Sequence, residues 1–118
     1  MEKIFIIGRT HPLQGEEYNQ AYQQFAEWES KLKEMGFEVV NPMKLFSKHT
    51  TIIQARKNMI MGLSECNAII LLDDWKEDDW ARHLFLNACQ VKCGIYTERD
   101  HNHLMLMAET LKAAMPKY

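Results

Sequence analysis

The feature that most constrains the fold is a series of short, continuous apolar runs separated by longer segments of mixed polarity. The runs are Lys3 to Gly8, Phe37 to Val40, Asn67 to Leu72 and Gly94 to Thr97. Apolar runs of about four to eight residues, bounded by glycine, proline or polar residues, are typical of strands buried on both faces of a parallel sheet. The sequence therefore predicts four buried strands.

The segments between these runs have the three-and-four apolar spacing of one helical face. The expected buried faces are Tyr18, Ala21, Tyr22, Phe25, Ala26 and Leu32; then Ile53, Ile60 and Leu63, with Arg56 at the edge; then Trp80, Ala81, Leu84, Phe85 and Ala88. Gly36 is expected to end the first helix in a left-handed conformation. A last helix is expected from Leu104 to Ala114.

Strands that alternate with helices predict a single α/β domain over residues 1–118, with a parallel sheet covered by helices on both faces. Ligands of such sheets lie beyond the carboxyl ends of the strands, near the point where the strand order reverses. The loops that could hold a ligand are Gly8 to Gly15, Asn41 to Lys44, Asp73 to Asp79 and Thr97 to His103.

The charge and the cysteines exclude several classes of function. Fourteen basic and sixteen acidic residues give a formal charge of -2, which provides no general attraction for nucleic acid or an anionic membrane. Cys66, Cys89 and Cys93 are odd in number and lack zinc-ligand spacing, so we expect buried thiols in a reducing compartment. No signal-peptide core or membrane span is present, and we expect a cytoplasmic protein.

The strands also carry a recognisable pattern. It consists of Ile4 to Gly8, the run GFEVVNP from Gly36 to Pro42, and the run CNAIILL from Cys66 to Leu72, followed by Trp75, Ala81 and Ala88. The pattern resembles a small uncharacterised family related to nucleoside 2-deoxyribosyltransferases. This resemblance implies a three-layer, flavodoxin-like sheet of four to five strands, a nucleoside or nucleotide pocket at the strand ends, and a homo-oligomer whose subunits complete each other's sites.

The resemblance also implies a glutamate nucleophile on the first turn of the third helix, at a position that Leu84 occupies here. Leucine cannot stabilise the positive charge that develops when an N-glycosidic bond breaks. Phe5 stands where the related transferases tend to have a tyrosine, and Met59 where a sugar-binding aspartate is expected. The usual chemistry of the family is therefore not expected.

Five carboxylates remain between Asp73 and Asp79, at the mouth of the predicted cleft. Asp78 and Asp79 could cap the third helix, whereas Asp74 or Asp78 could bind sugar hydroxyls, and both roles are compatible. Arg9 is the best cationic contact in the first loop, although a surface role fits it equally well. The expected ligand-binding residues are Gly8, Arg9, Asp74, Trp75, Asp78 and Asp79.

No cofactor or metal is expected. His101 and His103 have a spacing that does not point both rings to one side of a helix or strand. The acidic segment could hold magnesium, but no phosphate-binding loop accompanies it. The methionines of the second and last helices are interpreted as core residues, with an adaptable subunit interface as the alternative.

These observations lead to one hypothesis and two alternatives. The leading hypothesis is a catalytically altered domain that binds a nucleoside-like ligand, for sensing or protein interaction. The first alternative is an active glycosidase or transferase with a relocated carboxylate from Asp74, Asp78 or Glu98. The second is a ligand-free interaction module whose cleft is filled by Trp75 and Trp80.

Overall fold

The structure is a computed structural model that describes residues 2–10, 15–45, 51–90 and 93–98. Its elements are β1 (Lys3–Ile7), α1 (Glu16–Glu34), β2 (Glu38–Val40), η1 (Pro42–Leu45), α2 (Ile52–Ser64), β3 (Ala68–Leu71), η2 (Trp75–Glu77), α3 (Asp79–Gln90) and β4 (Gly94–Thr97). The predicted strands and the first three helices are thus confirmed. The helix expected from Leu104 to Ala114 lies outside the described residues.

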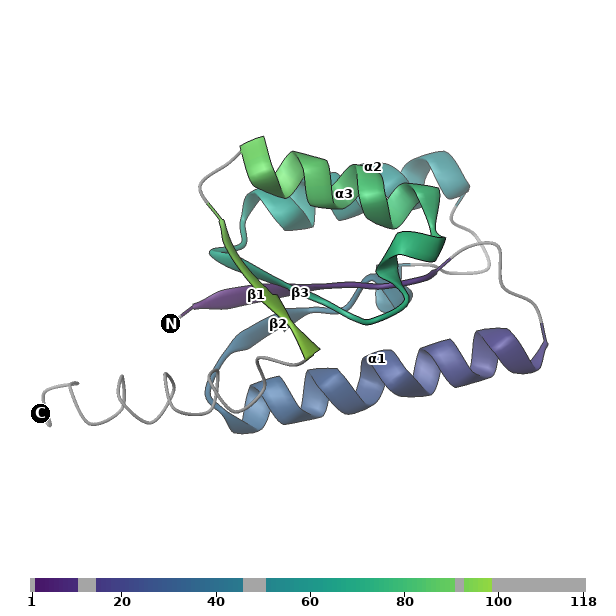
Figure 1. The fold of residues 1–118 in the computed structure, drawn as a ribbon, viewed down its shortest axis with the longest axis horizontal. Coiled ribbons are helices and arrows are strands. Elements are labelled where there is room, and N and C mark those ends of the chain that lie inside the picture. Colours follow the sequence, from purple (N-terminus) through teal and green to yellow (C-terminus); the bar gives the residue numbers. More distant parts are fainter. Residues whose placement is uncertain (1, 11–14, 46–50, 91–92, 99–118) are drawn as a thin grey trace, which may run out of the picture.

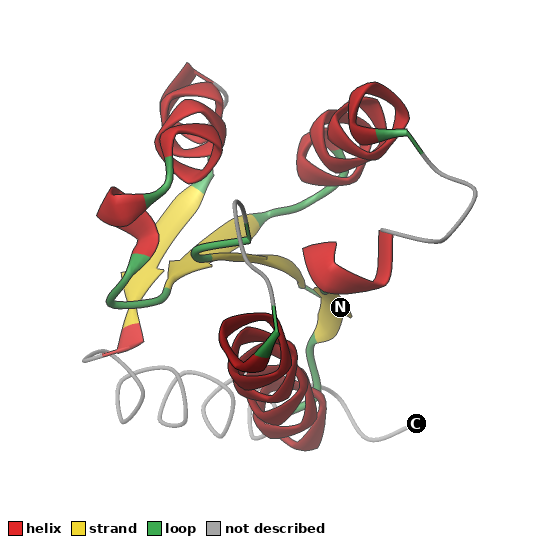
Figure 2. Ribbon diagram, turned by 90° about the vertical axis from the view of Figure 1, so that its right-hand side faces the viewer, coloured by secondary structure: helices red, strands yellow, loops and turns green. Residues whose placement is uncertain are grey.

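The strands form one parallel sheet in the order β2-β1-β3-β4. Helix α1 covers one face of the sheet, and α2 and α3 cover the other (Figures 1 and 2). This arrangement confirms the predicted three-layer, flavodoxin-like α/β fold. Because the chain moves from β1 to one side and then returns to place β3 on the other, the strand order reverses between β1 and β3.

Alternate residues of the central strands divide the core into two clusters. Ile4 and Ile6 of β1 pack toward α1, in a cluster that includes Phe25. Phe5 and Ile7 pack toward α2 and α3. Successive side chains of a strand point to opposite faces. Each short apolar run therefore contributes side chains to the core cluster on both faces of the sheet.

The buried face of α1 differs from the predicted one, because two tyrosines that were expected to be buried are exposed. Tyr18 and Tyr22 are 38% and 43% exposed, while Trp28 and Glu29, which the prediction omitted, are buried. At about 100° per residue, Tyr22 lies roughly a quarter turn from the line that faces the sheet. The two tyrosine rings instead lie next to each other, 6.4 Å apart.

Of the face predicted for helix α2, Leu63 is buried as expected, but the rest of the buried face differs from the prediction. Its buried residues are Ala55, Met59 and Leu63, whereas Ile53 is 66% exposed. Gly62 explains the choice, because a Cβ at this position would lie only 3.3 Å from a methyl of Val40. The helix therefore approaches the sheet on its glycine side, which leaves a second apolar stripe facing outward.

Helix α3 and Gly36 match the prediction more closely. Ala81, Leu84 and Ala88 are buried in α3, and Gly36 has a φ of 98° after α1. The half-buried Trp80 and Phe85 lie at the edges of the same core cluster.

The cysteines are less buried than predicted. Cys89 is exposed and Cys66 and Cys93 are half-buried, because these residues lie at the ends of elements rather than under the helices. Burial nevertheless raises the pKa of Cys66 to about 12. The Cys66 thiol therefore stays protonated at neutral pH.

Candidate functional site

The loops that follow β1 and β3 are joined at the point where the strand order reverses. The backbone N–H of Arg9 donates to Asp74 Oδ1 at 3.2 Å. The backbone N–H and the hydroxyl of Thr10 both donate to Asp78 Oδ2, at 2.8 and 3.2 Å. Two of the loops that the sequence singled out thus form one connected unit, held by carboxylates of the acidic segment.

Gly8 is needed at the end of β1 because of close packing. A Cβ on this residue would lie 2.9 Å from Leu72 Cδ1 and 3.0 Å from Phe25 Cζ. Its backbone does not have a positive φ. Gly8 therefore allows α1 to lie close to the sheet, and its contribution to a ligand site is indirect.

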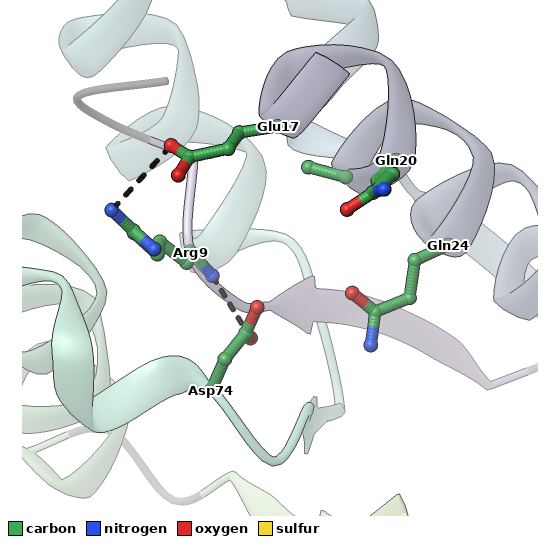
Figure 3. Close-up of a pocket in the computed structure, with 6 residues that line it drawn as sticks. Arg9, Glu17, Gln20, Gln24 and Asp74 are labelled. Carbon is green, nitrogen blue, oxygen red and sulfur yellow. Dashed lines mark hydrogen bonds and ion pairs between the residues drawn. The ribbon is translucent and has the colours of Figure 1, made fainter. Parts of the chain in front are cut away.

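A cavity of about 250 Å³ opens beside this junction (Figure 3). Its lining comes from the loop after β1, the first half of α1 and the loop after β3. The lining residues are Arg9, Glu17, Gln20, Ala21, Gln24 and Asp74. All but Ala21 are polar, so the cavity offers amides, carboxylates and a guanidinium within one small volume.

Arg9 is held loosely at the edge of this cavity. Its guanidinium lies 4.0 Å from carboxylate oxygens of both Glu17 and Glu77, a separation longer than a direct hydrogen bond. Its Nε is buried and, in the described part of the protein, has no hydrogen-bond partner. An unsatisfied buried donor costs free energy, and a ligand that accepts a hydrogen bond here would remove that cost.

Two carboxyl groups near the cavity have altered acidity. Burial raises the pKa of Asp74, against the opposing effect of its hydrogen bond from Arg9. Burial and a hydrogen bond with Asp73 raise the pKa of Glu98. Glu98 also accepts hydrogen bonds from Trp28 Nε1 at 3.0 Å and from Gln24 Nε2 at 3.4 Å. Gln24 thus links the cavity to Glu98, which follows β4.

The remaining predicted ligand-binding residues are occupied elsewhere. Asp78 is 3% exposed, and its Oδ1 caps α3 by accepting from the Trp80 N–H at 2.9 Å. The carboxylate of Asp79 faces solvent and pairs with Arg82. Trp75 packs against Phe85 at 4.7 Å. Of the six predicted residues, Arg9 and Asp74 line the cavity.

Leu84 lies on the other side of the sheet from this cavity. It is 3% exposed and belongs to the same buried cluster as Phe5 and Met59. The three positions where the resemblance led us to expect polar side chains are therefore packed together in the α2–α3 core. This packing leaves Leu84 as an ordinary core residue.

Sequence reasoning missed the contribution of α1. Glu17, Gln20 and Gln24 recur at i, i+3 and i+7, next to the buried line that includes Ala21 and Phe25. The helix that directly follows β1 begins at the carboxyl edge of the sheet. A polar stripe beside its apolar stripe could therefore have indicated residues that line a ligand site.

The loop after β2, also singled out from the sequence, is held by a buried carboxylate instead of lining the cavity. Glu29 lies 2.8 Å from Lys33 Nζ and 2.9 Å from Lys44 Nζ, and it accepts from Asn41 Nδ2 at 3.1 Å. Burial alone would raise the pKa of Glu29, but these hydrogen bonds outweigh it and lower the pKa to about 2. The network fixes α1 to the end of β2.

We expect Glu29→Gln to lower the free energy of unfolding by about 1–2 kcal/mol at pH 7, because it removes two charge-assisted contacts. A carboxylate with a lowered pKa stabilises the fold above its unfolded pKa, near 4.5, and this stabilisation is lost as the pH falls toward 2. The difference in the free energy of unfolding between the wild type and Glu29→Gln, measured by urea unfolding, should therefore be smaller at pH 3 than at pH 7. Glu27→Gln, at an exposed position of the same helix, is the control and should change neither value.

Among the described residues, no group of three histidine, cysteine or acidic side chains could hold a metal ion. The pair His101 and His103 lies outside those residues. In the described part of the chain, no helix has both the length and the apolar character needed to cross a membrane.

Residues 3–95 match a protein family described as a domain of unknown function (DUF4406). The chain belongs to this family. No curated protein and no solved structure matches it. The description of the DUF4406 family names no ligand or reaction.

Proposed function

We propose that this DUF4406 domain is a cytoplasmic protein that binds a small nucleoside-like ligand in the cavity next to Arg9 and Asp74, without glutamate-dependent N-glycosidic chemistry. The observation that carries the proposal is the position of a polar cavity at the reversal of strand order. In open parallel sheets this is where small ligands bind. The resemblance to nucleoside 2-deoxyribosyltransferases suggests the class of ligand.

The size and the lining of the cavity support a base or a nucleoside. Its volume of about 250 Å³ lies just below the range of about 300–1,000 Å³ typical of drug-sized ligands, which disfavours a dinucleotide. The amides of Gln20 and Gln24 each offer a donor and an acceptor, as the edge of a base requires. The carboxylate of Asp74 can accept hydrogen bonds from sugar hydroxyls.

The charges around the cavity favour an uncharged ligand. Glu17 and Asp74 line it, and Glu77 lies near the guanidinium of Arg9. A phosphate would gain one cation but would meet several carboxylates, and like charges at short range are unfavourable. We therefore propose that nucleosides or free bases bind more tightly than their monophosphates.

Ligand binding can be tested by isothermal titration and thermal unfolding with common nucleosides, free bases and 5′-monophosphates. We expect at least one uncharged compound to raise the melting temperature. Gln20→Ala should lower the affinity for that compound about tenfold, since a lost hydrogen bond is worth about 1–1.5 kcal/mol. Gln23→Ala is the control on the same helix, at an exposed position that does not line the cavity. No stabilisation by any compound would contradict the proposal.

Glu98 favours a second candidate function, a hydrolase that protonates the departing base. A carboxyl group with a raised pKa can hold the proton that a leaving base needs, and Gln24 connects Glu98 to the cavity. Chromatography of the same compounds after incubation separates the two functions. Release of free base that Glu98→Gln abolishes would favour the hydrolase, whereas intact compounds would favour binding alone.

A further inference from the structure

A second surface lies on the opposite side of the sheet from the cavity, on the face covered by α2 and α3 (Figure 1). A groove of about 500 Å³ runs here, lined by Ile53, Arg56, Lys57, Ile60, Met61 and Trp80. We call these six residues the α2 groove. Ile53 and Met61 are 66% and 64% exposed. Exposed apolar clusters of this kind mark interaction sites more often than isolated apolar residues do.

The spacing of the groove residues suits a helix as the occupant. Ile53, Lys57, Ile60 and Met61 stand at i, i+4, i+7 and i+8 of α2, so they share one outward face. This is the second apolar stripe, left free because α2 approaches the sheet on its Gly62 side. A continuous stripe on one helix packs naturally against an apolar stripe on another.

Trp80 forms a fixed wall of the groove. Its Nε1 donates to Met59 Sδ at 2.9 Å, the guanidinium of Arg56 lies 4.9 Å from its ring centroid, and the ring of His83 stacks on it at 5.0 Å. A side chain that is already held in place loses little conformational entropy on binding. Tryptophan and arginine are also the residues that contribute most to interface affinity.

The charge of the groove indicates an acidic partner. Helix α2 contains Arg56 and Lys57 but no aspartate or glutamate, although the whole chain has a net charge of -2. Within the described ranges, neither Arg56 nor Lys57 forms an ion pair, whereas Lys3, Lys44 and Arg82 do. The apolar floor is thus bordered by cations that carboxylates of a partner could neutralise.

We infer that the α2 groove binds an acidic amphipathic helix of a partner protein. A second copy of the chain fits less well, because a two-fold interface would place the same patch of each subunit against itself. The cations of one groove would then face those of the other, with no acidic residue of α2 to compensate. The inference does not depend on a ligand in the cavity.

A phage-displayed library of helical peptides, selected on the full chain, tests this inference. The enriched peptides should carry apolar residues at i, i+3 or i+4, and i+7, together with more acidic than basic residues. Peptide affinity is measured by fluorescence anisotropy. The double variant Ile53→Gln, Met61→Gln should lower the affinity for the best peptide at least about tenfold, and the single variant Lys57→Glu should do the same. Leu86→Gln is the matched control, because Leu86 is 60% exposed but lies outside the groove lining.

Three results would overturn the inference. The first is a selection that enriches no peptide, or only neutral or basic ones. The second is equal binding by the wild type and by the Ile53→Gln, Met61→Gln variant. The third comes from sedimentation velocity: a dimer that the same double variant converts to a monomer would identify a second copy as the occupant. Circular dichroism of each variant shows whether it retains the wild-type fold.

Discussion

Asp78→Ala is expected to lower the free energy of unfolding by about 3–4 kcal/mol. The substitution removes the N-cap of α3, which is worth about 1 kcal/mol, and two hydrogen bonds from Thr10 to a buried carboxylate. It also leaves the N–H of Thr10 without its acceptor at a residue that is only 8% exposed. Urea unfolding followed by circular dichroism measures the change.

The neighbouring Asp79 provides the control for this prediction. Its side chain is 93% exposed and pairs with Arg82 at the surface, so Asp79→Ala should cost less than about 1 kcal/mol. Equal effects of the two substitutions would contradict the structural role of Asp78. Loss of an activity in Asp78 variants would therefore have to be compared with their stability before Asp78 is assigned to ligand binding.

Most of the fold could be predicted because each strand is a short apolar run and each helix is periodic. The sheet order places Arg9 next to Asp74, and the rule for ligands of parallel sheets predicts both loops from the sequence alone. The face of α2 could not be predicted, since Ala55, Met59 and Leu63 and the outward stripe have similar helical spacing. The close approach at Gly62 decides between them, and that contact depends on tertiary structure.

The candidate site could be predicted only in part, because it too depends on tertiary contacts. A run of carboxylates shows which residues can bind a ligand, but not which of them the fold already uses. Asp78 and Asp79 are adjacent, yet one is buried under three hydrogen bonds and the other faces solvent. The amides of Gln20 and Gln24 were missed because they are unremarkable on an amphipathic helix until the cavity places them together.

Leu84→Glu is the strongest test of the view that the transferase chemistry is absent. It places a carboxylate at a position that is 3% exposed, within the cluster that contains Phe5 and Met59. We expect a loss of about 3–5 kcal/mol at pH 7, from the lost apolar packing and the cost of burying a charge. Equilibrium unfolding in urea measures it, and chromatography for released base should show no gain of activity.

The pH dependence of this variant separates the charge from the packing. Burial disfavours the ionised form, so the folded-state pKa of the new carboxyl should exceed its unfolded value, near 4.3. The variant should then lose stability as the pH rises above that value, by up to about 1.4 kcal/mol per pH unit until the folded-state pKa is reached. Leu84→Gln has the same shape without the charge and should show no such slope. A Leu84→Glu variant that matches Leu84→Gln at every pH would show that water reaches residue 84, and would contradict its assignment to the buried α2–α3 core.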